Sequence, residues 1–166
     1  VSGIDDLGAI SVDDDGLHIG AGATHTAIMT DPLIAEHAPA MIDAAHTVGA
    51  VQTRNLGTIG GNLVTCVPSM DSGPVLVALE ADVILAGASG IRRLALTEFF
   101  VGPRKTILAA GEMLVDIVIP KANLGKPAGF IKFGLRKGQA LALVNAASAA
   151  WIEDGKFAAP RIALGA

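Results

Sequence analysis

The chain contains 166 residues, the size of a single domain, although this length also accommodates two lobes. Its 12 Lys and Arg against 16 Asp and Glu give a net charge of −4, which argues against the basic face that nucleic-acid binding requires. Hydrophobic residues make up 51% of the chain and charged residues only 17%, so the composition excludes a disordered protein.

The first predicted element is a β-hairpin. Two β-like runs, 9–12 and 17–22, flank the sequence Asp13-Asp14-Asp15-Gly16. Aspartates tolerate turn geometry, and Gly16 can adopt a positive φ. The spacing of a twelve-residue calcium loop is absent, so the pattern favours a solvated turn.

Two helices are predicted next, over residues 24–29 and 40–48. Thr24 is suited to cap the first helix, because its hydroxyl can accept from a free amide of the first turn. In the second helix the apolar residues recur at helical spacing, and Gly49 can end it. His46 on this helix has no second metal ligand four residues away, so a core or surface histidine is favoured over a metal site.

Residues 52–74 show neither helical nor strand periodicity, yet they carry too little charge for a surface linker. Long irregular segments inside compact domains tend to be functional. The sequence therefore predicts an irregular functional segment here.

Beyond this segment, residues 75–120 are predicted to form one helix followed by strands. The predicted elements are a helix over 75–80, strands over 82–86, 91–96 and 112–120, and a short helical turn over 97–100.

A domain boundary is predicted at residues 121–129, which form a linker rich in Pro, Gly and Lys between a domain over 1–120 and a second lobe over 130–166. Three strands are expected in the second lobe, over 130–136, 141–152 and 156–164. No helix follows that could cover them. The mean hydropathy of +0.54 also indicates that aliphatic surface is covered by a partner or that the chain is part of something larger.

The cysteine content and the hydropathy profile bear on the cellular location. A single cysteine, Cys66, excludes an intrachain disulfide and an iron–sulfur cluster held by this chain alone, and is expected to be a buried apolar side chain. No stretch approaches about 20 apolar residues, so no membrane span is predicted. The first residues have neither a basic segment nor an apolar signal core, which predicts a cytoplasmic location.

Thr58-Ile59-Gly60-Gly61-Asn62 places two glycines between hydrogen-bonding side chains. Glycines let the backbone approach a ligand closely and can point successive amides in one direction, which forms an anion-receptive concavity. Asp71 could accept a hydrogen bond from a ribose hydroxyl or a ring N–H. A Gly-Gly turn packed inside a sheet corner is an equally good interpretation of the residues alone.

Other motifs are weaker. Residues 20–25 begin like a dinucleotide fingerprint, but His25 occupies the third glycine position. The four histidines are scattered without ligand spacing, and Cys66 lacks any signature of a nucleophile.

The chain nevertheless resembles the FAD-binding subunit, or medium subunit, of molybdenum hydroxylases such as xanthine and carbon monoxide dehydrogenases. The resemblance is carried by Arg54-Asn55-Leu56-Gly57-Thr58-Ile59-Gly60-Gly61-Asn62, by Pro68-Ser69-Met70-Asp71-Ser72, and by matches near residues 19–24, 98–103, 111–120 and 130–133. It implies an α+β fold, namely the second subdomain of a vanillyl-alcohol-oxidase-type FAD-binding domain followed by the start of a C-terminal α+β subdomain.

The resemblance also implies a set of cofactor-binding residues and no catalytic acid or base. Ile59 would lie beside the isoalloxazine, Asp71 would hydrogen-bond the adenosine side, Leu114 would contact the adenine region through its backbone, and Lys132 would approach the flavin. The implied cofactor-binding residues are Thr58, Ile59, Gly60, Gly61, Asn62, Asp71, Leu114 and Lys132.

The implied function is that of an oxidoreductase component. Electrons would pass from a molybdopterin-binding large subunit through an iron–sulfur small subunit to FAD on this chain, and then to NAD or another acceptor. The residues before Ile10 do not match the first glycine-rich flavin loop of the family, and the C-terminal subdomain is short, so a fragment is expected. The rival interpretation is a cofactor-free interaction or assembly fragment of the same subunit.

Overall fold

A computed structural model describes residues 3–166 as a mixed α/β structure, which confirms the predicted fold class. The helices are α1 (His25–Thr30), α2 (Pro32–His37), α3 (Ala40–Thr47), α4 (Val51–Leu56), α5 (Ile59–Thr65), α6 (Ser72–Ala78) and α7 (Leu96–Phe99), with 3-10 turns η1 (Asp5–Gly8) and η2 (Lys121–Asn123). The strands are β1 (Ile10–Val12), β2 (Gly16–Gly20), β3 (Asp82–Gly87), β4 (Gly90–Ala95), β5 (Phe100–Gly102), β6 (Lys105–Thr106), β7 (Met113–Pro120), β8 (Ala128–Gly134), β9 (Ala142–Glu153) and β10 (Lys156–Gly165).

A five-stranded antiparallel sheet has the order β1-β2-β7-β3-β4. The predicted hairpin at its edge is confirmed, since Asp13 Oδ1 accepts from the amides of Asp15 at 2.8 Å and Gly16 at 3.3 Å. The central strand β7 is buried between β2 and β3, as its nearly continuous apolar run requires.

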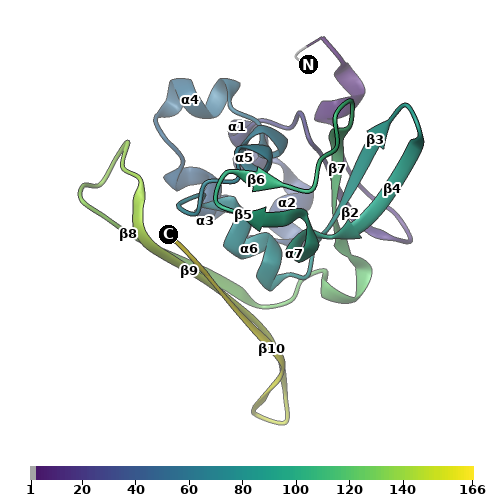
Figure 1. The fold of residues 1–166 in the computed structure, drawn as a ribbon. Coiled ribbons are helices and arrows are strands. Elements are labelled where there is room, and N and C mark those ends of the chain that lie inside the picture. The colour runs from purple at the N-terminus through teal and green to yellow at the C-terminus, as the bar shows by residue number, and fades with distance from the viewer. Residues whose placement is uncertain (1–2) are drawn as a thin grey trace.

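The second sheet is three-stranded, with the order β10-β9-β8, and confirms the predicted meander. Helices α3 and α6 pack against it, and the small side chains of Ala147 and Ala149 join the main core. Figure 1 shows the helices between the two sheets and the β9–β10 hairpin extending away from them.

The prediction of an irregular segment over 52–74 is wrong, because this stretch forms α4, α5 and the start of α6. Helices of six or seven residues are too short to display a clear period, and Gly60 and Gly61 lower the helical propensity of α5. Tertiary contacts therefore stabilise these helices where local sequence preference does not.

The predicted linker at 121–129 includes buried polar side chains. Lys126 is 1% exposed, and its Nζ donates to Asn123 Oδ1 at 3.3 Å and lies 3.7 Å from Glu80 Oε2. Asn123 in turn donates to the carbonyl of Leu79 at 3.0 Å. These contacts attach the segment to the end of α6. The division into a domain over 1–120 and a second lobe stays a prediction.

The outward face of the three-stranded sheet is exposed and apolar. Ile131 and Phe133 on β8 are 71% and 64% exposed, and Ile162 and Leu164 on β10 are 76% and 75% exposed. This face accounts for part of the high mean hydropathy, because these aliphatic and aromatic side chains face solvent in the isolated chain.

The helices within residues 3–166 are short, and none combines the length and the hydropathy that a membrane span requires.

Candidate functional site

The double-glycine motif forms the first turn of α5. Thr58 is the N-cap, and its Oγ1 accepts from the amide of Gly61 at 3.0 Å. The amide of Asn62 donates to the Thr58 carbonyl, and the amides of Ile59 and Gly60 donate to the carbonyls of Ala23 and Ala21, both at 2.9 Å. The predicted concavity of free amides is therefore wrong, because all four amides are consumed by the cap, the helix and the neighbouring strand end.

The first turn of α5 packs closely against Ala21 because residue 60 is a glycine. A Cβ on Gly60 would meet the Ala21 Cβ at 2.6 Å and the Ala21 carbonyl oxygen at 2.7 Å. The exposed Gly61 differs, because a Cβ there would meet only Thr58 Oγ1, at 3.1 Å. One glycine thus allows packing, whereas the other leaves an open surface beside the turn.

That open surface borders a largely apolar cavity of about 230 Å³ at the end of the five-stranded sheet. Four predicted cofactor residues line it: Thr58, Gly60, Gly61 and Leu114. Leu114 reaches the cavity from β7 and is otherwise buried, with 3% of its surface exposed. The structure therefore brings together a β7 residue and the double-glycine turn, which lie more than fifty residues apart in the sequence.

Three other predicted residues, Asn62, Asp71 and Lys132, line a second cavity of about 180 Å³. The two cavities lie on different faces of α5, because Gly60, Gly61 and Val64 border the first and Asn62 and Thr65 the second. The predicted site is thus divided between two faces of one short helix.

The second cavity contains a buried ion pair. The Nζ of Lys132 lies 2.6 Å from Asp71 Oδ2 and donates to the carbonyl of Thr47 at 3.2 Å. Asn145 on β9 donates to the other carboxylate oxygen of Asp71 at 3.0 Å and to the carbonyl of Met70 at 2.9 Å. The polar groups of Asp71 and Lys132 therefore face each other, and Asp71 is held by the three-stranded sheet.

Asn62 presents a polar edge to the second cavity. Its Oδ1 accepts from Ser72 Oγ at 2.5 Å. Its Nδ2 makes no hydrogen bond to the residues the structure describes and so can donate to a ligand.

The side chain of Ile59 points into the hydrophobic core. Its side chain is 0% exposed, belongs to the hydrophobic core and lines neither cavity. The buried side chain is therefore not available to a flavin, and the expectation that Ile59 lies beside the isoalloxazine stays a prediction for its backbone alone. This apolar side chain anchors α5 in the core, whereas Gly60 and Gly61 on the same turn border the first cavity.

Glu112 brings a negative charge to the first cavity. Arg92 binds both of its carboxylate oxygens, at 2.8 and 2.7 Å, and the amide of Ala109 also donates to it. The Arg92 hydrogen bonds, followed by that amide, lower the pKa of Glu112 to about 2. Glu112 is therefore ionised at neutral pH.

His25 is a buried histidine at the start of α1. Its Nδ1 has no hydrogen-bond partner among the residues described, and the side chain is 2% exposed. Burial lowers the pKa of His25, with a smaller opposing effect from Asp71. The imidazole is therefore neutral at pH 7.

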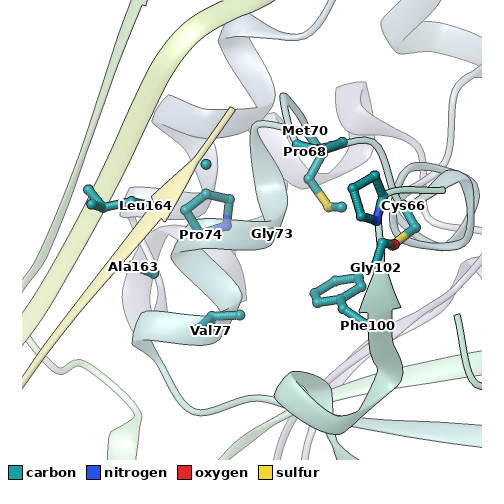
Figure 2. A pocket seen from close by; sticks show the side chains of 12 residues that line it. Cys66, Pro68, Met70, Gly73, Pro74, Val77, Phe100, Gly102, Ala163 and Leu164 are labelled. Carbon is teal, nitrogen blue, oxygen red and sulfur yellow. The ribbon is translucent and has the colours of Figure 1, made fainter. Parts of the chain in front are cut away.

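A largely apolar cavity of about 410 Å³ lies between α6 and the end of β10, and none of the predicted cofactor residues lines it. Figure 2 shows Met70, Pro74, Phe100 and Cys66 around it. Cys66 is 4% exposed, and its Sγ donates to the carbonyl of Gly102 at 3.3 Å. The prediction that Cys66 is a buried apolar side chain is confirmed.

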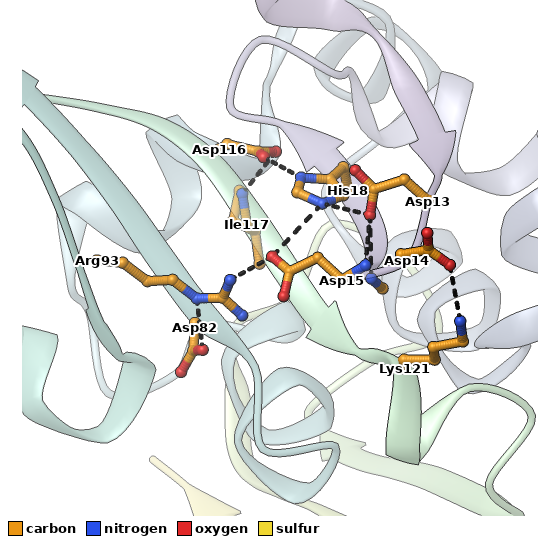
Figure 3. A network of polar contacts seen from close by, with 10 residues as sticks. Asp13, Asp14, Asp15, His18, Asp82, Arg93, Asp116, Ile117 and Lys121 are labelled. Carbon is orange, nitrogen blue, oxygen red and sulfur yellow. Dashed lines mark hydrogen bonds and ion pairs between the residues drawn. The ribbon is translucent and has the colours of Figure 1, made fainter.

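A polar network crosses the five-stranded sheet from the β1–β2 turn to β4 (Figure 3). His18 Nδ1 is 2.6 Å from Asp116 Oδ2, and its Nε2 is 3.3 Å from Asp13 Oδ1. Arg93 bridges Asp15 and Asp82. Desolvation alone would lower the pKa of His18, but the hydrogen bond and charge of Asp116, with Asp13 and Asp15, outweigh it and raise the pKa above 6.5.

Several residues that border the two cavities are not among those predicted from the sequence, including Ala21, Gly22, Val48, Gly49 and Glu112. One sequence pattern does indicate residues 21 and 22 of this set. The glycine-rich run at 20–25 does not complete a Rossmann fingerprint, yet the carbonyls of Ala21 and Ala23 in this run accept hydrogen bonds from the amides of Gly60 and Ile59. A glycine-rich strand end can serve a site without belonging to a βαβ unit.

Comparisons with known proteins show the family of the chain. A family model described as the FAD binding domain in molybdopterin dehydrogenase matches residues 1–122. The nicotinate dehydrogenase FAD-subunit of Eubacterium barkeri is 36% identical over 152 residues, which are 90% of this chain and 51% of that protein. The chain spans about half the length of the curated relatives it matches.

Two solved structures share the fold of this chain. Carbon monoxide dehydrogenase from Hydrogenophaga pseudoflava superposes with a TM-score of 0.94 at 27% identity, covering 99% of this chain and 57% of that one. Quinoline 2-oxidoreductase from Pseudomonas putida 86 superposes with a TM-score of 0.91 at 33% identity, with the same coverage.

Proposed function

Because the chain belongs to the family of FAD-binding domains of molybdopterin dehydrogenases, we propose that it positions FAD at the two faces of α5 and passes electrons through it. The observation that carries this proposal is the meeting of Thr58, Gly60, Gly61 and Leu114 around one cavity beside the short helix. Asn62, Asp71 and Lys132 border the other face of the same helix.

The residues fit parts of the cofactor in different ways. The side-chain-free surface of Gly61 and the apolar side chain of Leu114 suit a flat ring. Asn62 Nδ2 and Lys132 Nζ suit the polar edge of a ring system. The amides of residues 59–62 are already hydrogen-bonded, so the diphosphate is expected to bind to other groups.

FAD supplies the redox chemistry of such a site when it is bound, and the protein binds and orients it. The roles of this chain follow from its own residues. Gly60 brings α5 against the sheet, Thr58 caps the helix, and the Asp71–Lys132 pair anchors the three-stranded sheet beside the second cavity.

The proposed electron route begins outside this chain. A molybdopterin-binding large subunit oxidises the substrate, and an iron–sulfur small subunit delivers electrons to the FAD held here, which reduces NAD or another acceptor. Relatives such as the carbon monoxide dehydrogenase medium chain of Hydrogenophaga pseudoflava support this assignment, since their names describe one chain of a multi-subunit dehydrogenase.

Titration of the purified chain with FAD, followed by flavin fluorescence, tests the proposal. Gly61→Val fills the first cavity from an exposed helical position and is expected to weaken FAD binding at least about tenfold without loss of the fold. Gly129→Val is the matched control, because Gly129 lies on the exposed face of β8 and a Cβ at this position would have no atom of another residue within 4 Å. Equal FAD affinity of both variants contradicts the site.

A second function is favoured by one specific observation, the exposed apolar outer face of β8 and β10. On this alternative the chain is an assembly fragment of the same subunit that docks to other parts of the enzyme and retains no FAD. A colourless protein that stays colourless after incubation with FAD supports the alternative, and saturable flavin binding contradicts it.

A further inference from the structure

Ser72, at the start of α6, carries a buried hydroxyl group that lines neither of the two cavities beside α5. The residue is 1% exposed, and its Oγ lies 2.5 Å from Oδ1 of Asn62 on α5. Asn62 does line the second cavity. The hydroxyl group of Ser72 is therefore connected to that cavity through the side-chain amide of Asn62.

The direction of this hydrogen bond follows from the burial of Ser72. A serine hydroxyl has one proton to donate, whereas a side-chain amide can present either its oxygen or its NH2 group. Among the residues described, Asn62 is the one hydrogen-bond partner of the Ser72 side chain, and the burial of Ser72 keeps water from replacing it. If Nδ2 faced Ser72, the hydroxyl proton would be buried without an acceptor, which is unfavourable. The oxygen of Asn62 therefore faces Ser72.

The NH2 group of Asn62 is left open to the second cavity. The two ends of a planar amide point in different directions, so a bond from Oδ1 to Ser72 turns Nδ2 away from it. Nδ2 has no hydrogen-bond partner among the residues described, yet it is not one of the buried polar atoms that lack one. It is thus an accessible donor on the wall of the cavity.

The preceding residue, Asp71, orients the other donor of this cavity. Its Oδ2 accepts from Lys132 Nζ at 2.6 Å, and its Oδ1 accepts from Asn145 at 3.0 Å. The carbonyl of Thr47 accepts a second proton of Lys132 at 3.2 Å, so one of the ammonium protons stays free. Two consecutive residues at the start of α6 therefore orient one donor on α5 and another on β8.

Two oriented donors favour a ligand group that accepts hydrogen bonds. Because Asp71 balances the charge of Lys132, the pair attracts a phosphate less than a free ammonium group would. Neutral acceptors, such as carbonyl oxygens and unprotonated ring nitrogens, match the donors without requiring further positive charge. A flavin ring carries both kinds of acceptor along one edge.

We propose that Ser72 is a positioning residue of the second cavity, whose hydroxyl group holds the Asn62 amide so that its NH2 group donates to a carbonyl or ring-nitrogen acceptor of the ligand. Ser72 acts through Asn62 and touches no ligand itself. The identification of that acceptor with the flavin ring rests on the proposed function, whereas the orientation of the amide does not.

A double-mutant cycle on the purified chain tests whether Ser72 acts through Asn62. FAD affinity is measured by flavin fluorescence for the parent, Ser72→Ala, Asn62→Ala and the double variant. Ser148→Ala is the matched control, because Ser148 is exposed on β9 and lines neither cavity. Urea denaturation of each variant shows that it is folded at the temperature of the titration.

Ser72→Ala is expected to weaken FAD binding about three- to tenfold in the parent, since one hydrogen bond contributes on this scale. In the Asn62→Ala background the same change is expected to alter the affinity less than about twofold, because the amide that it orients is gone. The Ser148→Ala control keeps the affinity of the parent. A merely structural effect of Ser72 would weaken binding equally in both backgrounds.

Two spectroscopic measurements complement the cycle. At saturating FAD, Ser72→Ala and Asn62→Ala are expected to displace the visible absorption bands of the bound flavin in the same way, because both remove the oriented donor. In the unaltered chain without FAD, NMR cross-peaks from the Asn62 NH2 protons are expected to side chains that line the second cavity. This second measurement needs no variant.

Three results would overturn the proposal. The first is an equal effect of Ser72→Ala in both backgrounds, and the second is an unchanged flavin spectrum in Ser72→Ala. The third is a set of strong cross-peaks between the Asn62 NH2 protons and Ser72, which would show the opposite orientation of the amide. If the parent binds no FAD while the cross-peaks point into the cavity, the proposed function fails and the orientation by Ser72 is supported.

Discussion

The ammonium group of Lys132 lies 2.6 Å from the carboxylate of Asp71, although 61 residues separate them in the chain. Their side chains are only 11% and 6% exposed. Asp71 immediately precedes α6, whereas Lys132 lies on β8, so the pair joins the helical layer to the three-stranded sheet. Asn145 adds a hydrogen bond from the neighbouring strand β9. Two residues that resemble cofactor ligands thus also hold the two parts of the fold together.

Lys132→Met tests this structural role. The variant leaves the Asp71 carboxylate buried without its counter-charge, which is expected to lower the free energy of unfolding by about 3–5 kcal/mol. Urea denaturation measures the loss. Lys156→Met on the exposed β9–β10 turn serves as the control and is expected to change stability little. A loss below about 1 kcal/mol for Lys132→Met would mean that water or another group replaces the ammonium.

The two neighbouring glycines are expected to respond oppositely to alanine. Gly60→Ala places a methyl group 2.6 Å from the Ala21 Cβ and 2.7 Å from the Ala21 carbonyl oxygen, and is expected to cost about 1–3 kcal/mol through overpacking. Gly61→Ala is exposed and gains helical propensity, so its stability is expected to stay within about 1 kcal/mol of the parent. Thermal or urea unfolding distinguishes them, and equal losses would contradict the packing of Gly60 on the sheet.

Arg92→Gln is expected to raise the pKa of Glu112 from about 2 towards 4.5, because the guanidinium that binds both carboxylate oxygens is lost. A carboxyl-detected NMR titration measures the pKa directly. Since folding lowers this pKa, the contribution of Glu112 to stability is present above pH 4.5 and is lost as the pH falls towards about 2. An unchanged pKa in the variant would show that the Ala109 amide alone sustains the shift.

The contribution of His18 to stability is expected to have the opposite pH dependence. Its pKa is raised in the folded protein, where Asp116 and Asp13 flank its two ring nitrogens. Its stabilising contribution is therefore complete below the unfolded pKa of 6.5 and is lost as the pH rises through the folded pKa. His18→Gln is expected to destabilise the protein more at about pH 6 than at about pH 9.

Urea denaturation of the parent and of His18→Gln at both pH values gives the measurement. The difference between the two proteins is needed, because burial lowers the pKa of His25 and makes its own contribution fall as the pH decreases below 6.5. A destabilisation that is equal at both pH values would contradict the ion pairing of His18.

Signals within a few residues determined much of this fold. The turn at Asp13–Gly16, the Thr24 cap of α1 and the apolar runs of β7 and β9 could be read from the sequence, because each depends on local backbone preference or on a simple alternation of side chains. The specific string at 54–62 likewise indicated the family without any coordinates.

Only the tertiary structure decided how the motif residues are used. The amides of Ile59 and Gly60 bond to carbonyls of Ala23 and Ala21, more than thirty residues away, and this contact turned an expected anion cradle into a helix start packed on a sheet. Likewise Lys132 meets Asp71, and Ser72 meets Asn62, because β8 and α5 pack beside α6. Hydrogen-bond partners and charge neighbours that are distant in the chain leave no local pattern, so the sequence alone could indicate the residues of the site but not their contacts.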